Sequence, residues 1–269
     1  MPVTGKIQLT EGKETLFITL YAKAVDCRAK RSILHDRKAD EIFKTIDGDF
    51  TKYKGFGNIV TVVRARHFDE WIKEFIAENA DAVVLYLGCG LDTRITRISP
   101  AAGVNWFDVD YPDVIGLRKT FYADRAGYKM IGSAVTDPRW FEEIPCDRPT
   151  VIVAEGILEY IAADDVKILL NRITDYFPHG DMMFDVMSSV AIKAGQEKLK
   201  DTTGAVLKWA VDSIAQVDDL NPALKIVQAL SPFRSRFARG LSPRERLFYG
   251  FVSLFPKYRN MLRILLYRF

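Results

Sequence analysis

Short apolar runs alternate with amphipathic segments from about residue 81 to the end of the chain. Val, Ile, Leu, Met and Phe dominate these runs, as they do in strands that are buried on both faces of a sheet. The segments between them repeat apolar residues at helical spacing, most clearly at 112–127 and 166–177. This rhythm predicts a parallel α/β sheet with helices on both faces. Strands are expected at 82–88, 104–109, 128–133, 150–154, 181–187, 224–230 and 261–269.

Two segments depart from this rhythm and divide the chain. Residues 1–80 predict a helical N-terminal cap, with an amphipathic helix at 59–76 and helical pieces near 15–21 and 33–36. Residues 188–222 predict two more helices, at 191–199 and 204–215, which form a helical lid inserted after the fifth strand. The core is then made of residues 81–187 and 223–269. A capping box, Ser242-Pro243-Arg244-Glu245, predicts that a further helix begins near residue 243.

The first strand leads into a glycine turn. Gly88-Cys89-Gly90 follows Val83–Leu87, and a helical pattern begins at Leu91. A tight turn without a ligand is one interpretation, and a loop that brings main-chain N–H groups close to a ligand is the other. A dinucleotide fingerprint would need a third glycine at position 93, where the chain has Thr93, which disfavours nicotinamide and flavin dinucleotides.

About twenty residues further on, the second strand ends in two carboxylates, Asp108 and Asp110. An acid at this place in a nucleotide-binding sheet can accept hydrogen bonds from both ribose hydroxyls. The two observations together indicate a nucleotide-like ligand at the carboxyl edge of the sheet.

Charge is unevenly distributed along the chain. Of the total formal charge of +3, residues 225–269 contribute +9, with ten Lys and Arg against the single acid Glu245. The arginines are explained either as solvated helix faces or as a patch for an anionic substrate, carrier or membrane surface. Nucleic acid is not expected as a partner.

The cysteines, the histidines and the apolar stretches argue against several classes of protein. Cys27, Cys89 and Cys146 have no metal-ligand or disulfide spacing, and the three histidines are equally scattered, so no metal site is expected. The charged N-terminus is unlike a signal peptide, and no run approaches the ~20 apolar residues of a membrane-spanning helix. We therefore expect a cytoplasmic protein with no stable membrane insertion.

Three motifs together resemble the leucine carboxyl methyltransferase family, in particular its branch of polyketide-type O-methyltransferases. They are LGCGLDTR at 87–94, FDVDYP at 107–112 and AEGILEYI at 154–161, and RARHFD at 64–69 and SAVTDPRW at 133–140 add support. The resemblance implies a seven-stranded, Rossmann-like class I methyltransferase sheet and S-adenosyl-L-methionine as the cofactor.

The resemblance also implies how the nucleoside part of this cofactor is held. Gly88 and Gly90 let the backbone lie against the methionine and ribose portion. Asp110, or its neighbour Asp108, holds the ribose hydroxyls. Ser133 and Ala134 fall where the adenine edge is expected, and Ala134 leaves recognition there to the backbone.

The amino-acid part of the cofactor is assigned to charged side chains. Arg64 is expected to pair with the carboxylate, with help from Lys23, and Glu155 is expected to face the ammonium or sulfonium. The alternatives are a surface arginine for Arg64 and a helix N-terminal acid for Glu155.

Methyl transfer from a sulfonium depends mainly on alignment, and only a hydroxyl acceptor usually needs a base. The expected reaction is O-methylation of a carboxylate or phenolic hydroxyl on a small, polyketide-like molecule. Methylation of a protein C-terminal carboxylate and a non-catalytic cofactor-binding protein with a basic surface are the alternatives. The sequence contains no obvious His–Asp pair, and a homo-oligomer is compatible with it. The candidates for a catalytic group are His67, Glu159, Tyr160 and Tyr21.

Overall fold

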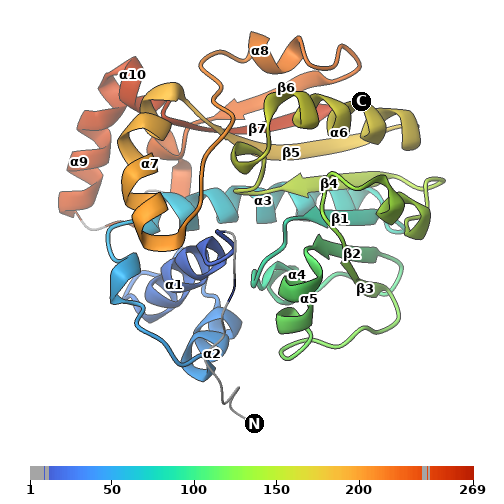
Figure 1. The fold of residues 1–269 in the computed structure, drawn as a ribbon, viewed down its shortest axis with the longest axis horizontal. Coiled ribbons are helices and arrows are strands. Elements are labelled where there is room, and N and C mark those ends of the chain that lie inside the picture. Colours follow the sequence, from blue (N-terminus) through green and yellow to red (C-terminus); the bar gives the residue numbers. More distant parts are fainter. Residues whose placement is uncertain (1–8, 10–11, 238–240, 242) are drawn as a thin grey trace.

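A computed structural model describes residues 9, 12–237, 241 and 243–269. A central sheet crosses the molecule, with helices around it (Figure 1). The observed strands match the seven predicted runs to within one residue at each end. They are β1 Val83–Leu87, β2 Asn105–Asp110, β3 Tyr128–Gly132, β4 Thr150–Ala154, β5 Gly180–Met187, β6 Lys225–Leu230 and β7 Leu262–Arg268.

Helices occupy the N-terminal region, the connections between strands and the segment before β7. Short 3₁₀ turns at Thr51–Tyr53, Pro138–Glu143, Leu158–Tyr160 and Pro232–Arg234 supplement them. The capping residue predicted at Ser242 lies outside the described residues, but the helix after it begins at Pro243 as expected. The helices are α1 Thr15–Arg28, α2 Arg37–Thr45, α3 Asn58–Glu78, α4 Arg94–Ile98, α5 Pro112–Arg118, α6 Ala163–Tyr176, α7 Ser189–Thr203, α8 Ala215–Asp218, α9 Pro243–Leu254 and α10 Pro256–Arg259.

The strand order in the sheet is β3-β2-β1-β4-β5-β7-β6. The pairs from β3 to β5 are parallel, whereas β7 is antiparallel to both β5 and β6, so the parallel rhythm stops before the last strand. Leu87 at the end of β1 is level with Val109 of β2 and Ala154 of β4. This register brings the loops that follow three strands to one edge, which is where open α/β sheets bind ligands.

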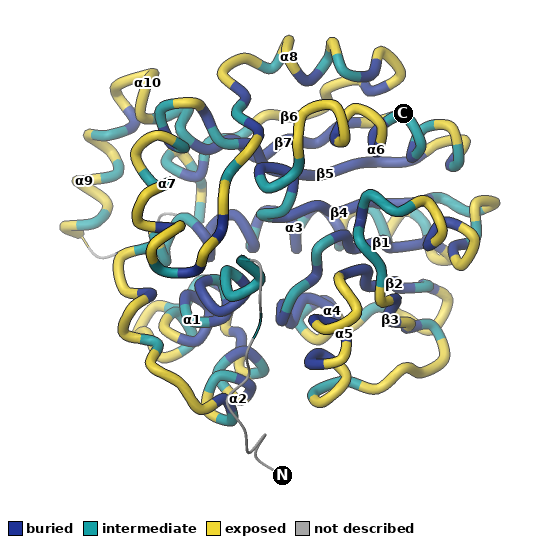
Figure 2. The backbone as a smooth tube through the Cα atoms, viewed as in Figure 1, coloured by how far each residue is buried: buried dark blue, intermediate teal, exposed yellow. Residues whose placement is uncertain are grey.

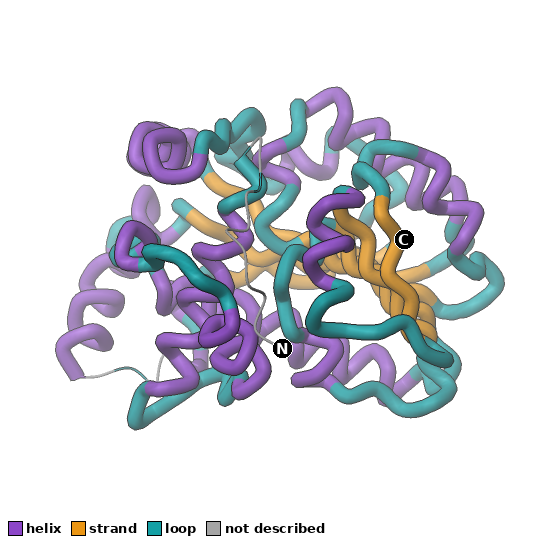
Figure 3. Tube along the Cα trace, turned by 60° about the horizontal axis from the view of Figure 1, so that its bottom comes forward, coloured by secondary structure: helices purple, strands orange, loops and turns teal. Residues whose placement is uncertain are grey.

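Each face of the sheet carries its own hydrophobic core. Alternate residues of a strand point to opposite faces, and β1 shows this alternation. Val83, Leu85 and Leu87 pack with α6 on one face, while Val84 and Tyr86 pack with α3 and α4 on the other. Figure 3 shows the strands running through the middle of the molecule between helices, and Figure 2 shows that the deepest burial follows them.

The N-terminal helices pack mainly against each other and close over one end of the sheet. Leu16, Phe17 and Leu20 of α1 share a hydrophobic cluster with Ile42 of α2 and Leu117 of α5. The helix α3 takes part in both regions, because Phe68, Trp71 and Ile72 in its second half belong to the core on one face of the sheet. Helix α3 therefore contacts both the N-terminal helices and the sheet.

The helix predicted at 112–127 is too long, because α5 ends at Arg118. Residues further along are needed for the turn into β3. Asp124 accepts a hydrogen bond from the main-chain N–H of Met130 at 2.9 Å, and Gly127 adopts a positive φ of 73°. These contacts place residues 124–130 in the turn into β3, so the helix does not extend to residue 127.

The helix predicted at 204–215 is wrong. Gly204 ends α7 with a φ of 75°, and the chain then continues without helix to α8. Main-chain N–H groups in this stretch bond to other elements. Val211 N donates to the Met187 carbonyl at 2.8 Å, and Lys208 N donates to the Glu159 carbonyl at 2.7 Å. Tertiary hydrogen bonds thus override the local apolar spacing.

The outer surface is formed mainly by helices and loops. In the part of the chain that the structure describes, no helix has both the length and the apolar character needed to cross a bilayer. The same residues contain no cluster of three or more His, Cys, Asp or Glu side chains suited to a metal ion. The basic C-terminal segment is used partly for packing, since Arg263 is buried and Arg268 pairs with Asp181 at 2.8 Å.

Candidate active site

A large cavity lined by described residues, with a volume of about 850 Å³, opens at the carboxyl edge of the parallel strands. The loops after β1, β2 and β4 form its floor, and α1, α3 and α7 form its walls. The predicted site residues in its lining are Lys23, Arg64, Gly88, Gly90, Asp110, Glu155, Glu159 and Tyr160.

The glycine turn after β1 follows from backbone conformation. Gly88 has a φ of 66° and Gly90 a φ of 49°, a left-handed region that favours glycine. A Cβ at Gly88 would also lie 2.8 Å from Cγ1 of Ile157. Both glycines are needed for the turn itself, and their lack of side chains leaves the backbone open to the cavity.

Asp110 joins this turn to the end of β2. Its Oδ2 accepts a hydrogen bond from Gly90 N at 2.7 Å, and its Oδ1 accepts one from Tyr111 N at 2.7 Å. Burial raises the pKa of Asp110 to about 6, although these two main-chain N–H groups act to lower it. Each carboxylate oxygen keeps a further lone pair for a ligand hydroxyl.

Asp108 lies below the edge, inside the sheet, and does not line the cavity. Its Oδ2 pairs with Nη2 of Arg118 at 2.6 Å and accepts the Tyr128 hydroxyl at 2.6 Å. Its Oδ1 accepts Nε1 of Trp106 at 2.8 Å. These partners occupy the carboxylate, which leaves Asp110 as the acid of this pair that reaches the cavity.

Ser133 and Ala134 lie beside the cavity but not in its lining. Ser133 N donates to the Asp110 carbonyl at 2.8 Å, which holds the loop after β3 against the end of β2. The lining on this side is supplied by the next two residues, Val135 and Thr136.

A cluster of buried charges lies beside the loop after β4. Nε of Arg64 donates to Oε1 of Glu155 at 3.0 Å, and its Nη1 donates to Oδ2 of Asp185 at 2.7 Å. Arg94 also pairs with Glu155. Burial acts to raise the pKa of Glu155, but the charges of Arg94 and Arg64 outweigh it and hold this pKa below its ordinary value.

Lys23 reaches the cavity from α1. Its Nζ lies 2.8 Å from Oδ2 of Asp92, which also accepts the Tyr86 hydroxyl at 2.8 Å. Arg97 binds the other oxygen of Asp92 at 2.8 Å. Burial opposes ionisation of Asp92, yet Arg97 and Lys23 hold its pKa well below the usual range.

The four candidates for a catalytic group fall into two pairs. Glu159 and Tyr160 line the cavity. His67 lies away from it, with Nε2 at 2.8 Å from Oγ of Ser235, and burial lowers its pKa to about 4. Tyr21 packs against Phe43 and is not part of the lining.

Comparison with known proteins agrees with this arrangement. The sequence model described as leucine carboxyl methyltransferase matches residues 17–174, which is more than half of the chain. The chain belongs to the leucine carboxyl methyltransferase family. It is therefore an S-adenosyl-L-methionine-dependent methyltransferase.

Two relatives within this group align over most of their length. The tetracenomycin polyketide synthesis O-methyltransferase TcmP of Streptomyces glaucescens is 37% identical to this chain, and the alignment covers 98% of each protein. The S-adenosyl-L-methionine-dependent methyltransferase dpfgK of Gibberella zeae is 29% identical, with 82% of each chain covered.

Solved structures share the methyltransferase fold at low identity. A DUF574 family protein from Streptomyces avermitilis has a TM-score of 0.64 at 11% identity, over 94% of this chain and 96% of its own. Magnesium protoporphyrin IX methyltransferase (ChlM) from Synechocystis PCC 6803, solved with bound S-adenosylhomocysteine, has a TM-score of 0.51 at 9% identity. That alignment covers 87% of this family member and 94% of ChlM.

The chemistry of the cavity fits the cofactor of the family. S-adenosyl-L-methionine has a ribose, a carboxylate, an ammonium and a sulfonium. The lining of this methyltransferase offers an acid at Asp110, cations at Arg64 and Lys23, and a further acid at Glu155. Each kind of group on the ligand therefore has a side chain of suitable charge in one cavity.

Sequence reasoning missed Asp185, which binds both Arg64 and the main-chain N–H of Gly156, the latter at 2.8 Å. One feature of the sequence could have indicated this residue. Asp185 interrupts the apolar run of β5, and a carboxylate in a doubly buried strand needs a cationic partner. The lining contributed by α7, including Leu199, also carried no recognisable motif in this family member.

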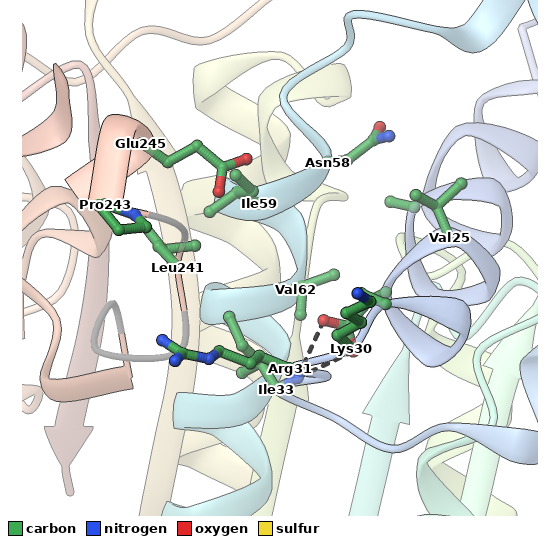
Figure 4. Close-up of a pocket in the computed structure, with 13 residues that line it drawn as sticks. Val25, Lys30, Arg31, Ile33, Asn58, Ile59, Val62, Leu241, Pro243 and Glu245 are labelled. Atoms are coloured by element: carbon green, nitrogen blue, oxygen red, sulfur yellow. Dashed lines mark hydrogen bonds between the residues drawn. The ribbon is translucent and has the colours of Figure 1, made fainter. Parts of the chain in front are cut away.

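A second cavity, of about 400 Å³, lies between α1, the start of α3 and the beginning of α9 (Figure 4). Val25, Ile59 and Leu241 contribute to its largely apolar wall, and Lys30 and Arg31 also line it. Its described lining includes none of the site residues predicted from the sequence, so the methyltransferase site is assigned to the larger cavity.

Proposed function

We propose that the protein methylates an oxygen atom of a small, polyketide-like aromatic acceptor. The observation that carries this proposal is the single cavity in which charged groups suited to the cofactor adjoin an apolar wall. That wall includes Leu16, Phe56, Val60 and Leu199. The full-length alignment with a polyketide O-methyltransferase supports the same acceptor class.

The cofactor supplies a methyl group on a positively charged sulfur, and the chain positions it. We assign the ribose hydroxyls to Asp110 and the close backbone approach to Gly88 and Gly90. The carboxylate is assigned to Lys23 and to Nη2 of Arg64, the nitrogen that takes no part in the pairs with Glu155 and Asp185. Hydrogen bonds to charged groups contribute about 1.5–3 kcal/mol each.

Glu155 is assigned to the ammonium group, since arginines keep it ionised. The adenine is assigned to the loop of Ser133 and Ala134, where Val135 and Thr136 supply the lining. Residues 191–208, from α7 and the stretch after it, form one wall of the cavity. In our proposal they act as the predicted lid over the acceptor.

Calorimetry tests the cofactor assignments. Asp110→Ala removes two hydrogen bonds to the ribose, so the Kd for S-adenosylhomocysteine should rise about 100-fold, or ~2.7 kcal/mol. Asp175→Asn, which removes an exposed charge on α6, is the matched control. Unchanged binding in the Asp110 variant, with an unchanged melting temperature, would contradict the proposed site.

Methylation of a protein C-terminal carboxylate is the second candidate, because the family description names a carboxyl methyltransferase. The two functions differ in the size of the acceptor. Methyl transfer to aromatic polyketides but not to peptides with a free C-terminal carboxylate supports the small-molecule function, and the reverse result supports the second candidate.

A further inference from the structure

Helix α9, the short helix α10 and Phe255 between them present apolar side chains to solvent. Half of the large apolar side chains that are exposed among the described residues lie here. Leu247 is 77% exposed, Leu254 is 66% exposed and Phe248 is 62% exposed. Figure 2 shows both helices as mainly exposed, at the edge of the molecule. We name this surface the α9–α10 face; it consists of Leu247, Phe248, Phe251, Leu254, Phe255 and Tyr258.

The exposed side of α9 is not the side that packs against the rest of the protein. Leu247, Phe251 and Leu254 recur at helical spacing and form one stripe. On the other side Ser253 is buried, and Tyr249 stacks on Phe233 with the ring centroids 5.5 Å apart. A surface helix normally turns polar residues outward, so α9 has a second apolar side that the fold does not use.

The aromatic rings of this face contact one another. The ring centroids of Phe251 and Phe255 are 5.2 Å apart, and those of Phe255 and Tyr258 are 6.2 Å apart. Both pairs are edge-to-face, an arrangement that aromatic rings prefer. Single exposed apolar side chains are ordinary on protein surfaces, but a contiguous patch marks an interaction site. The row of side chains therefore indicates a partner that offers an apolar surface.

Positive charge lies at both ends of the α9–α10 face. Arg244 and Arg246 are in the first turn of α9, and Lys257 and Arg259 are in α10. Cations at a helix N-terminus oppose the helix dipole, so the two arginines do not serve to stabilise α9. Glu245, the single acid of the basic C-terminal segment, lines the second cavity. The partner is therefore expected to carry negative charge where it meets the two ends of the face.

A membrane with anionic lipids meets both requirements at once. Its acyl chains accept aromatic and leucine side chains, while the phosphate groups just above them attract arginine and lysine. A second copy of this chain fits less well, because a two-fold contact through this face would set the same cations against each other.

We infer that the α9–α10 face binds reversibly to the surface of a membrane that contains anionic lipids. The two helices lie along that surface, with Phe251 between the lipid headgroups and the acyl chains and with the flanking cations at the phosphates. Tyr249 connects this face to the methyltransferase site, because Phe233, on which it stacks, lines the larger cavity. The inference does not depend on the proposed function, since none of the six side chains of the face lines that cavity.

Sedimentation of the whole chain with lipid vesicles tests this surface. Vesicles of phosphatidylcholine are compared with vesicles in which half of the lipid is phosphatidylglycerol. The protein should partition onto the anionic vesicles at least about tenfold more strongly, because each basic residue near the surface contributes about fivefold in affinity. In about 1 M NaCl, which screens charges beyond ~3 Å, this preference should disappear.

Two matched double variants separate this face from the rest of the surface. Arg246→Gln combined with Leu247→Gln removes one cation and one exposed apolar side chain from α9, and partition onto anionic vesicles should fall roughly tenfold or more. Lys167→Gln combined with Ile168→Gln removes the same two kinds of group from the exposed side of α6 and should leave the partition unchanged. The Kd for S-adenosylhomocysteine should stay the same in both variants, which shows that each is folded.

A second readout locates the contact on the protein. Phe251→Trp places a fluorescent ring on the α9–α10 face, whereas all native tryptophans are buried. Lipids with brominated acyl chains should quench the fluorescence of this variant on anionic vesicles and leave that of the wild type nearly unchanged. Vesicle binding without this quenching would place the contact on another face and overturn the inference.

Comparison of the variants decides between a membrane and other partners. Loss of the preference for anionic vesicles in the α9 variant but not in the α6 variant supports the inference. No binding to vesicles, or the same loss in both variants, overturns it. A lipid-free dimer that the α9 variant dissociates would assign the face to a second copy, and binding of an acidic carrier protein without binding of vesicles would assign it to a protein partner. Both of these results also overturn the inference.

Discussion

Binding of the cofactor should depend on pH through Asp110, because this acid must be ionised to accept two ribose hydroxyls. Its pKa lies near 6 instead of at the ordinary value of 3.8. As the pH falls through 6, Asp110 gains a proton and loses acceptor capacity. About a tenth of the groups remain ionised at pH 5, so the apparent Kd for S-adenosylhomocysteine should rise about tenfold from its value at pH 7, or ~1.4 kcal/mol.

The raised pKa of Asp110 also affects the folding stability of the cofactor-free protein, but this stability falls as the pH rises, whereas cofactor binding becomes tighter. A raised pKa means that the folded state binds the proton more tightly than the unfolded chain does. Protonated Asp110 therefore stabilises the fold at low pH, and this contribution of ~3 kcal/mol is lost as the pH rises from 3.8 to about 6. Cofactor binding offsets that cost at neutral pH.

Titration calorimetry between pH 5 and 7, in two buffers of different ionisation enthalpy, measures both the Kd and the proton release. Wild-type protein should release about half a proton on binding near pH 6. The variant Asp110→Asn should bind more weakly at every pH and show no release in this range. A Kd that is independent of pH in the wild type, or an equal pH dependence in the variant, would refute the assignment of Asp110.

Three further predictions concern stability and the acceptor. Gly88→Ala should lower the free energy of unfolding by ~2–5 kcal/mol in urea titrations, because backbone strain adds to a 2.8 Å clash with Ile157. Gly204→Ala has open space around the new methyl group and should lower it by only ~1–2 kcal/mol. Equal losses in the two variants would contradict the packing argument. Asp69→Asn removes the charge of an acid that the buried Arg94 and Arg97 share, one of several that pair with them, and should cost about 3–5 kcal/mol, measured by thermal unfolding. A shift within the error of the melt would contradict this. Val206→Asp puts a charge on the cavity wall and should raise the KM for an aromatic acceptor at least tenfold while leaving the Kd for the cofactor unchanged. A change in the cofactor Kd alone would instead place Val206 in the cofactor region.

The strands could be predicted from the sequence because their apolar runs are short, continuous and bounded by turn residues. Val83–Leu87 is an example, since both of its faces are covered and no alternation obscures it. The glycine turn could also be located, and the acid at the end of the second strand could be narrowed to Asp108 or Asp110, because close backbone approach and ribose binding restrict the residue types expected there. The position of Lys23 on the cavity was reached through resemblance alone.

The parts of the fold and site that the sequence did not predict are decided by tertiary interactions, which leave little trace in the local sequence pattern. The stretch after Gly204 has apolar residues at helical spacing, yet its main-chain N–H groups bond to Glu159 and Met187. Asp108 and Asp110 look equivalent in the sequence, and they are separated by the tertiary partners that occupy Asp108, the ion pair with Arg118 among them. The reversal of β7 depends on a connection through α9 and α10 whose path no short motif specifies.

The place of β7 has a consequence for how the protein is made. This strand lies between β5 and β6, although both precede it in the chain. Until it is synthesised, β6 has no neighbour to pair with and β5 presents an open edge, the kind of surface at which chains join each other. Sheet closure therefore waits for a contact between residues far apart in sequence, which slows folding. A nascent chain that stops before Leu262 should aggregate rather than fold.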